Sequence, residues 1–171
     1  MMKTRFGIVI FYFSLLTFAL FAHFANAQVP ADREDLLNGK GIGDGVVAES
    51  NGYPGPMHVI DLADKLKLTD AQRKSVQEVQ KSMKTRAREL GQRIVGIEEE
   101  LNEAFSSGLV SEKSMREDCD QIARLRGRLR AVHLAAHLKT KELLTEQQID
   151  LYKKLKGAEK SDDTKQSRQK H

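Results

Sequence analysis

Apolar side chains recur every three or four residues along two long segments of the chain, at positions 76–105 and 115–143. This spacing places them on one face of an α-helix, so each segment predicts a long amphipathic helix. The short polar sequence at 106–108 ends the first helix, and Ser111 can cap the second. Because the connection is short, the two predicted helices are antiparallel neighbours. The pattern predicts an all-α fold: a long antiparallel helical hairpin with short flanking helices.

The predicted hairpin is long and thin. A helix over residues 70–106 would measure roughly 55 Å at 1.5 Å per residue. The two apolar seams cover each other, but a structure of two helices shields little else. We therefore expect a partner chain to complete the burial, which favours a homodimer.

Two copies of a Leu-Thr-x-x-Gln pattern flank the predicted hairpin in the sequence. In each copy the Thr side chain can cap a helix N-terminus, while the Gln three residues later reaches back to the Thr backbone. A short amphipathic stretch at 58–66 precedes the first copy. Each copy therefore predicts the start of a helix. The residues concerned are Leu68, Thr69 and Gln72 in the first copy, and Leu144, Thr145 and Gln148 in the second.

The amino terminus has the layout of a secretory signal peptide. A basic start precedes an apolar run at 7–21, and the small-x-small sequence Ala25-Asn26-Ala27 follows. The apolar run is short for a membrane-spanning helix, which needs about 20 residues. We expect residues 1–27 to be a signal peptide that is cleaved after Ala27 and exports the mature chain.

Composition divides the rest of the chain into three parts. Residues 28–56 hold all three prolines and half of the twelve glycines, which predicts a flexible or wrapping arm. Residues 57–156 form the helical-hairpin domain, and the polar residues 157–171 form a disordered tail. The single cysteine, Cys119, lies on the apolar face of a predicted helix, so we expect it to be buried.

Glycines occur in two unusual arrangements. Those of the segment 39–45 alternate with other residues, but no predicted strand precedes them and no Gly-Lys-Ser/Thr ends them, so they do not form a nucleotide-binding loop. Gly91, Gly96 and Gly127 interrupt the predicted helices at a cost of about 1 kcal/mol each relative to Ala. They gather near the middle of the hairpin; glycines without a structural role are one interpretation, and a close backbone approach or a bend there is the other.

Charged residues are distributed unevenly along the predicted hairpin. Basic residues dominate its open end, and acidic residues dominate 98–120 around the turn. The formal net charge of +4 gives no reason to expect nucleic-acid binding. An ordinary solvated surface is one interpretation; the other is a basic stem that contacts the acidic tip of a second subunit, an acidic client segment or lipid headgroups. The basic stem comprises Lys81, Lys84, Arg88, Arg124, Arg126, Arg128 and Arg130.

The two Leu-Thr-x-x-Gln boxes around a long hairpin, behind a signal peptide, resemble the Spy/CpxP family of periplasmic stress proteins. Relatives in that family include the zinc-resistance-associated proteins and the CnrX-type metal sensors. The resemblance covers roughly residues 57–156 and implies a cradle-like dimer in the periplasm. It implies ATP-independent chaperone activity on unfolded periplasmic proteins, or binding to a membrane sensor kinase or anti-sigma partner. For other members it implies stress or heavy-metal sensing.

The histidines are the one candidate chemical site. His133 and His137 are four residues apart, on one helix face, a spacing that can chelate Zn²⁺ or Ni²⁺. The antiparallel register places Met83 opposite them, and His58 is among the nearest further candidates. A pair of packed or surface histidines is the structural alternative.

No arrangement of side chains predicts catalysis. No Glu lies between the two histidines, which excludes an HExxH hydrolase, and no serine sits in a nucleophile elbow. We therefore expect a protein that is not an enzyme. The leading hypothesis is a client- or sensor-binding stress protein; the alternatives are a metal sensor or metal-resistance protein, and an envelope protein bound to a membrane surface.

Overall fold

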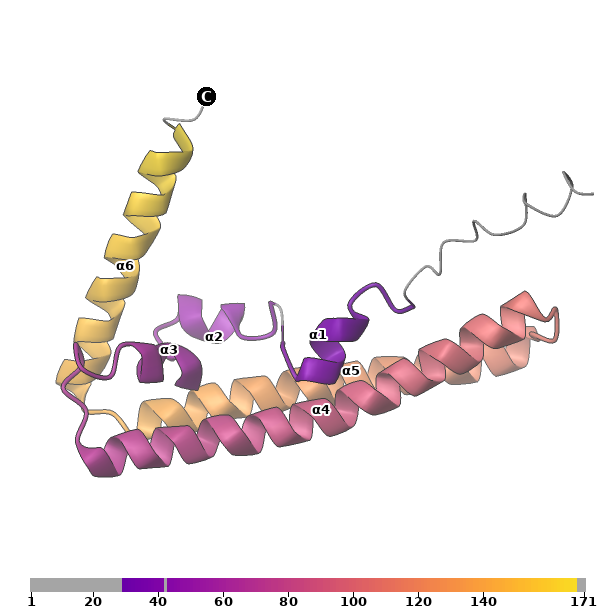
Figure 1. The fold of residues 1–171 in the computed structure, drawn as a ribbon, viewed down its shortest axis with the longest axis horizontal. Coiled ribbons are helices and arrows are strands. Elements are labelled where there is room, and N and C mark those ends of the chain that lie inside the picture. Colours follow the sequence, from indigo (N-terminus) through magenta and orange to yellow (C-terminus); the bar gives the residue numbers. More distant parts are fainter. Residues whose placement is uncertain (1–28, 42, 169–171) are drawn as a thin grey trace, which may run out of the picture.

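The computed structural model describes residues 29–41 and 43–168, with side chains up to residue 157, and these residues form helices joined by turns (Figure 1). The predicted signal peptide lies outside the described residues. Among the helices described, none is long and apolar enough to cross a membrane. The helices are α1 (Arg33–Asn38), α2 (Val46–Ser50), α3 (Pro56–Asp61), α4 (Asp70–Ser106), α5 (Glu112–Glu142) and α6 (Glu146–Arg168).

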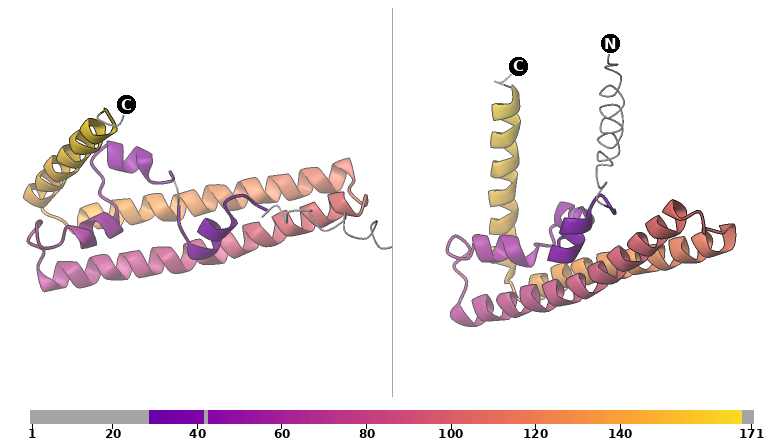
Figure 2. Two further views of the ribbon diagram at one scale, coloured as in Figure 1. Left: turned by 45° about the horizontal axis from the view of Figure 1, so that its top comes forward. Right: turned by 45° about the vertical axis from the view of Figure 1, so that its right-hand side comes forward.

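Helices α4 and α5 lie side by side as the predicted antiparallel hairpin (Figures 1 and 2). The Thr69 hydroxyl accepts a hydrogen bond of 3.2 Å from the backbone N–H of Gln72, whose side chain accepts one of 3.1 Å in return. The Ser111 hydroxyl caps α5 in the same way. Gly108 adopts φ +71° in the turn between the helices, a conformation that glycine adopts at little cost. The all-α hairpin is thus confirmed.

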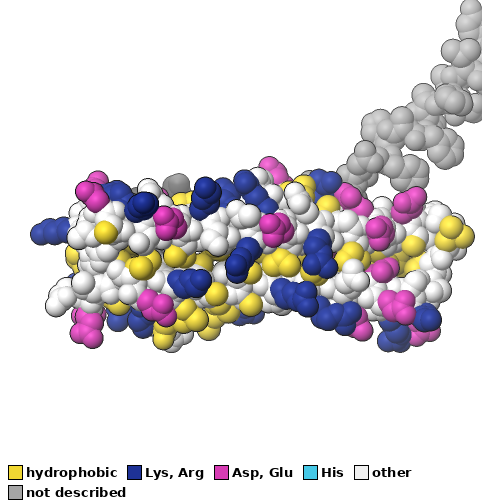
Figure 3. All heavy atoms as spheres, turned by 90° about the horizontal axis from the view of Figure 1, so that it is seen from below, with side chains coloured by type: hydrophobic (Ala, Val, Ile, Leu, Met, Phe, Trp, Pro, Cys, Tyr) yellow, Lys and Arg dark blue, Asp and Glu magenta, His cyan; other side chains and the backbone are white. Residues whose placement is uncertain are grey.

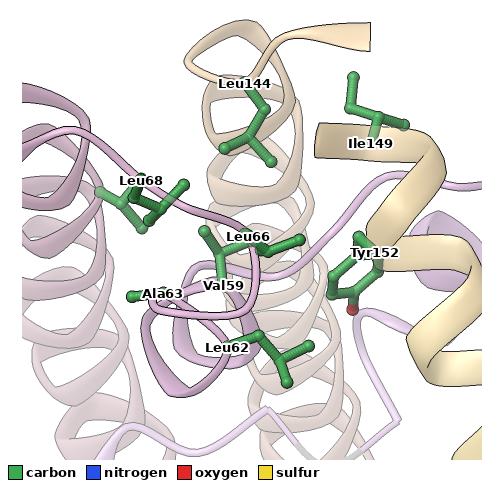
Figure 4. Packing of buried hydrophobic residues seen from close by; sticks show 9 residues of the cluster. Val59, Leu62, Ala63, Leu66, Leu68, Leu144, Ile149 and Tyr152 are labelled. Atoms are coloured by element: carbon green, nitrogen blue, oxygen red, sulfur yellow. The ribbon is translucent and has the colours of Figure 1, made fainter. Parts of the chain in front are cut away.

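The two Leu-Thr-x-x-Gln boxes meet at the open end of the hairpin. The second box starts α6, where Thr145 donates a backbone hydrogen bond of 2.9 Å to the Gln148 side chain. The amide groups of Gln72 and Gln148 also exchange hydrogen bonds of 2.9 and 3.1 Å. Beside them, Leu144 and Ile149 join the buried apolar cluster in Figure 4, which links α3, α4 and the start of α6.

Residues 29–41 and 43–56 lie along one face of the hairpin and contain the two helices α1 and α2, an arrangement that matches the wrapping form of the predicted arm (Figures 1 and 2). Helix α1 buries Leu36, 3% exposed, among apolar residues of α4 and α5. The backbone of Leu36 lies so close to Gly91 that a Cβ there would overlap its carbonyl. The predicted close approach is therefore real at Gly91, although it is made by the arm; Gly96 and Gly127 face open space.

Two further predictions need correction. Cys119 is exposed, because only two helices pack near the turn and each leaves much of its surface to solvent. Residues 157–168 continue α6 to Arg168, where a disordered tail was expected. This segment contains no proline, and a single Gly157 does not end the helix.

Candidate functional site

Two buried histidines lie between the hairpin and the arm. His133 and His137, each 7% exposed, contact residues 39–55 of the arm from α5. A Cβ on Gly41 would lie 2.6 Å from Nε2 of His133, and one on Gly45 would overlap Nε2 of His137. Glycine at these positions therefore lets the arm cover the two imidazoles closely. This close approach gives the alternating glycines of the arm a structural role.

Three imidazoles share one hydrogen-bonding arrangement. Nδ1 of His133 lies 3.0 Å from a carbonyl oxygen one turn earlier on α5, and Nδ1 of His137 lies 2.9 Å from the Tyr53 carbonyl oxygen. Nδ1 of His58 lies 2.7 Å from Oε1 of Glu49. Because carbonyl and carboxylate oxygens accept hydrogen bonds, each Nδ1 is the donor in its contact, which leaves Nε2 as the ring nitrogen that faces other groups. Nε2 of His133 is buried and has no hydrogen-bond partner among the described residues.

The same three histidines line one cavity of about 220 Å³ together with Met83, so all four metal candidates from the sequence lie around it. Glu49 and Met57 line it as well. Imidazole nitrogen and carboxylate oxygen are ligands for Zn²⁺ and Ni²⁺, and a thioether can add a softer ligand. Within the described residues, no group of three or more His, Cys, Asp or Glu is already arranged to hold a metal ion. Metal binding here would therefore require side chains to move, together with the arm backbone at Gly41 and Gly45 that covers the two Nε2 atoms.

An ion-pair cluster fastens the start of the arm to the basic stem. Arg126 donates hydrogen bonds of 2.7 and 3.1 Å to Asp32, and Glu98 lies 3.6 Å from the same guanidinium. Arg33 donates a hydrogen bond of 2.7 Å to Glu99. The hydrogen bonds from Arg126 lower the pKa of Asp32 from its ordinary value, and Asp32 in turn raises the pKa of Arg126. The anionic partner of Arg126 is thus an arm residue of the same chain, a pairing that the sequence analysis missed.

The other basic-stem residues lie around the hairpin and are open to solvent. Some of them line the surface beneath the arm: Lys84 lines the histidine cavity, and Arg88 packs against Gly39. Apart from Arg126, none of the basic-stem residues forms an ion pair within the part of the chain that the structure describes. An external anionic partner therefore stays a prediction. The remaining stem residues are Lys81, Arg124, Arg128 and Arg130.

An apolar groove of about 530 Å³ opens between α4 and α5, and no residue of the arm lines it. Figure 3, which shows the hairpin from the side away from the arm, displays a band of hydrophobic side chains flanked by both basic and acidic side chains. Val79, Val132 and Ala135 contribute apolar surface to the groove, and Arg86 and Lys139 are among its charged lining residues. The apolar periodicity predicted that α4 and α5 meet along apolar faces. It could not predict which part of this apolar surface stays open, because that depends on which side of the hairpin the arm covers.

Comparison with known proteins gives no match: no family model, no curated protein and no solved structure is significantly similar to the chain. The class that the fold and site define is an all-helical hairpin protein with an ordered N-terminal arm. Its two candidate sites are the histidine cavity under the arm and the apolar groove on the other side of the hairpin.

Proposed function

We propose that the protein is a periplasmic, Spy/CpxP-like stress protein that binds exposed segments of other proteins without ATP. The observation that carries this proposal is the apolar groove between α4 and α5, which the arm leaves open. Removing apolar surface from water is favourable by about 25 cal/mol per Å² before the entropic cost of association is subtracted, and contiguous exposed apolar surface typically marks an interaction site. The open Arg and Lys side chains attract acidic segments over a distance of about 10 Å.

Suppression of client aggregation tests this function. The mature chain is added to a chemically unfolded protein as it is diluted into buffer, and light scattering is followed with and without ATP. We expect suppression at near-stoichiometric ratios, independent of ATP. The double variant Val79→Gln/Ala135→Gln places two polar side chains in the groove and is expected to lose most of the suppression.

The matched control carries the same chemistry outside the groove. Leu109 and Leu138 are 82% and 53% exposed, and neither lines the groove. Leu109→Gln/Leu138→Gln is therefore expected to suppress aggregation as the wild type does. Equal activity of the two double variants would show that the groove is not the binding site.

A second function is favoured by the buried Nε2 of His133, which has no partner among the described residues. A buried polar atom without a partner is uncommon and often marks a place for a water or an ion. Ligating histidines usually donate the other ring N–H to a carbonyl or carboxylate, as His58, His133 and His137 do. We propose, as the alternative, that the cavity under the arm binds Zn²⁺ or Ni²⁺ in a metal sensor or a metal-resistance protein.

Calorimetric titration with Zn²⁺ and Ni²⁺ tests the metal function. The wild type is expected to bind one equivalent, and His133→Ala/His137→Ala is expected to lose that heat. His58→Gln, which leaves both α5 histidines in place, is expected to weaken binding without abolishing it. Identical heats in the wild type and the double variant would end the metal proposal.

A further inference from the structure

The apolar groove between α4 and α5 has the shape of a seat for a third helix. Its floor contains small side chains from both helices, among them Ser75 and Ser82 on α4 and Ala131 and Ala135 on α5. Small side chains allow the axis of a packed helix to come close, because interaxial distances depend on the side chains at the contact. The lining extends over about three turns of each helix, or about 16 Å.

The chemistry of the lining favours a helix over an extended segment. An extended chain would bring its backbone N–H and C=O groups against a surface that is mostly apolar, and each group left unpaired is costly. A helix satisfies those groups internally and presents only its side chains. Helices that dock in grooves do so with apolar anchors at positions i, i+3 or i+4, and i+7.

The charges beside the groove favour an acidic occupant. Arg86 lines it from α4 and Lys139 from α5, and Glu78 is the single acidic lining residue. On α5, Arg128 precedes Ala131, Ala135 and Lys139 at spacings that share one helix face. None of these three basic residues forms an ion pair with another residue that the structure describes. Their charges are therefore available to a partner.

We propose that this groove binds an amphipathic α-helix of a partner protein, with an apolar stripe of about three turns flanked by Asp and Glu. This inference rests on the proposed binding function and specifies its partner. The apolar stripe covers the floor around Val79 and Ala135, and the flanking carboxylates pair with Arg86 and Lys139. The helix then forms a three-helix bundle with α4 and α5 on the side away from the arm.

Three labelled peptides with one apolar stripe test the proposal by fluorescence anisotropy. The first has Glu at its flanking positions, the second has Lys there, and the third is the Glu peptide with two central prolines that prevent a helix. At low salt we expect the Glu helix to bind at least tenfold more tightly than either of the others. The preference is expected to shrink as salt screens the charges.

Charge reversal inside and outside the groove provides the matched control. Arg86→Glu/Lys139→Glu is expected to reverse the order and bind the Lys helix more tightly than the Glu helix. Lys81→Glu/Arg130→Glu makes the same change in net charge at exposed positions that do not line the groove. It is expected to keep the preference for the Glu helix, with a smaller loss of affinity.

Several results would overturn the proposal. Equal binding of the Glu and Lys helices, equal binding of the proline peptide, or the same reversal in the control variant would each do so. If sedimentation shows a dimer that Ala135→Gln disrupts and that excludes the Glu helix, the occupant is a second copy of this chain. If no helix binds while aggregation suppression still depends on Val79 and Ala135, the proposed function stands and the helical partner is wrong.

Discussion

Replacing Gly by Ala is expected to stabilise the hairpin at two positions, Gly96 and Gly127, and to destabilise it at a third, Gly91. In a helix interior, Ala is more favourable than Gly by about 1 kcal/mol. At Gly96 and Gly127 a Cβ meets open space, so Gly96→Ala and Gly127→Ala should each raise the free energy of unfolding by about 0.5–1 kcal/mol. At Gly91 the new methyl group would overlap the Leu36 carbonyl, so α1 must move away.

The cost at Gly91 can be worked out from what α1 buries. Displacing α1 exposes the side chain of Leu36, now 3% exposed, which costs about 1.5–3 kcal/mol. The helix-propensity gain of about 1 kcal/mol offsets part of this. Gly91→Ala is therefore expected to lower stability by about 0.5–2 kcal/mol, and to be about 1.5–3 kcal/mol less stable than the other two variants.

Urea unfolding followed by circular dichroism measures the stability of the three variants, and limited proteolysis reports whether the arm has been released. Gly91→Ala is expected to open cleavage sites between residues 33 and 50 under native conditions, while the other two variants stay protected. If Gly91→Ala stabilises the chain as much as Gly127→Ala and leaves the arm protected, the packing of α1 described above is wrong.

Three other predictions concern how the arm and the boxes are held. The pKa of Asp32 is lower in the folded chain than in the unfolded chain. The ionised carboxylate therefore stabilises arm docking fully above the unfolded pKa of about 3.9, and this stabilisation is lost as the pH falls through the folded pKa. Proteolysis of the arm should therefore accelerate at acid pH in the wild type, whereas in Asp32→Asn it should already be fast at neutral pH. Equal proteolysis rates of the wild type and Asp32→Asn at neutral pH would contradict this. Gln72→Ala and Gln148→Ala should each lower the free energy of unfolding by about 1 kcal/mol, and the double variant should lose less than the sum; strict additivity would show that the two amides do not interact. Gly41→Ala should speed amide hydrogen exchange in residues 39–55, because the new methyl group overlaps the His133 imidazole. Adding His133→Ala removes that imidazole and should slow the exchange again. If neither variant changes the exchange, the contact between Gly41 and His133 is refuted.

The hairpin could be predicted because its signals are local. Each box places a Thr and a Gln three residues apart, and the same two side chains form the cap in the structure. The apolar spacing of α4 and α5 likewise needs only neighbours along one helix. What local signals could not show is that Gln72 and Gln148 bind each other across the open end of the hairpin.

The arm was harder to predict because contacts distant in sequence hold it in place. Its helices are short, and isolated helices of that length are unstable in water. Their stability comes from Leu36 in the hairpin core, from the ion pair of Asp32 with Arg126, and from the glycines over His133 and His137. Two features of the sequence could have indicated this docking, although neither was interpreted in that way: the excess of acidic residues in the arm, and its alternating glycines.

The exposed Cys119 shows the limit of reasoning from one helix face. It lies on the apolar side of α5, but near the turn no other described element covers that side. An apolar face predicts burial only where a second surface is available to cover it. The same argument explains why the groove on the other side of the hairpin stays open.

Crosslinking from the groove is the measurement that tests the central claim most directly. A photoreactive benzoylphenylalanine is placed at Ala135 in one sample and at Leu138 in another, and each is irradiated with an unfolded client. The account predicts a strong adduct from Ala135, which lines the groove, and a weak one from Leu138, which does not. Equal adducts from both positions, or a stronger one from Leu138, would contradict the claim that partners bind between α4 and α5.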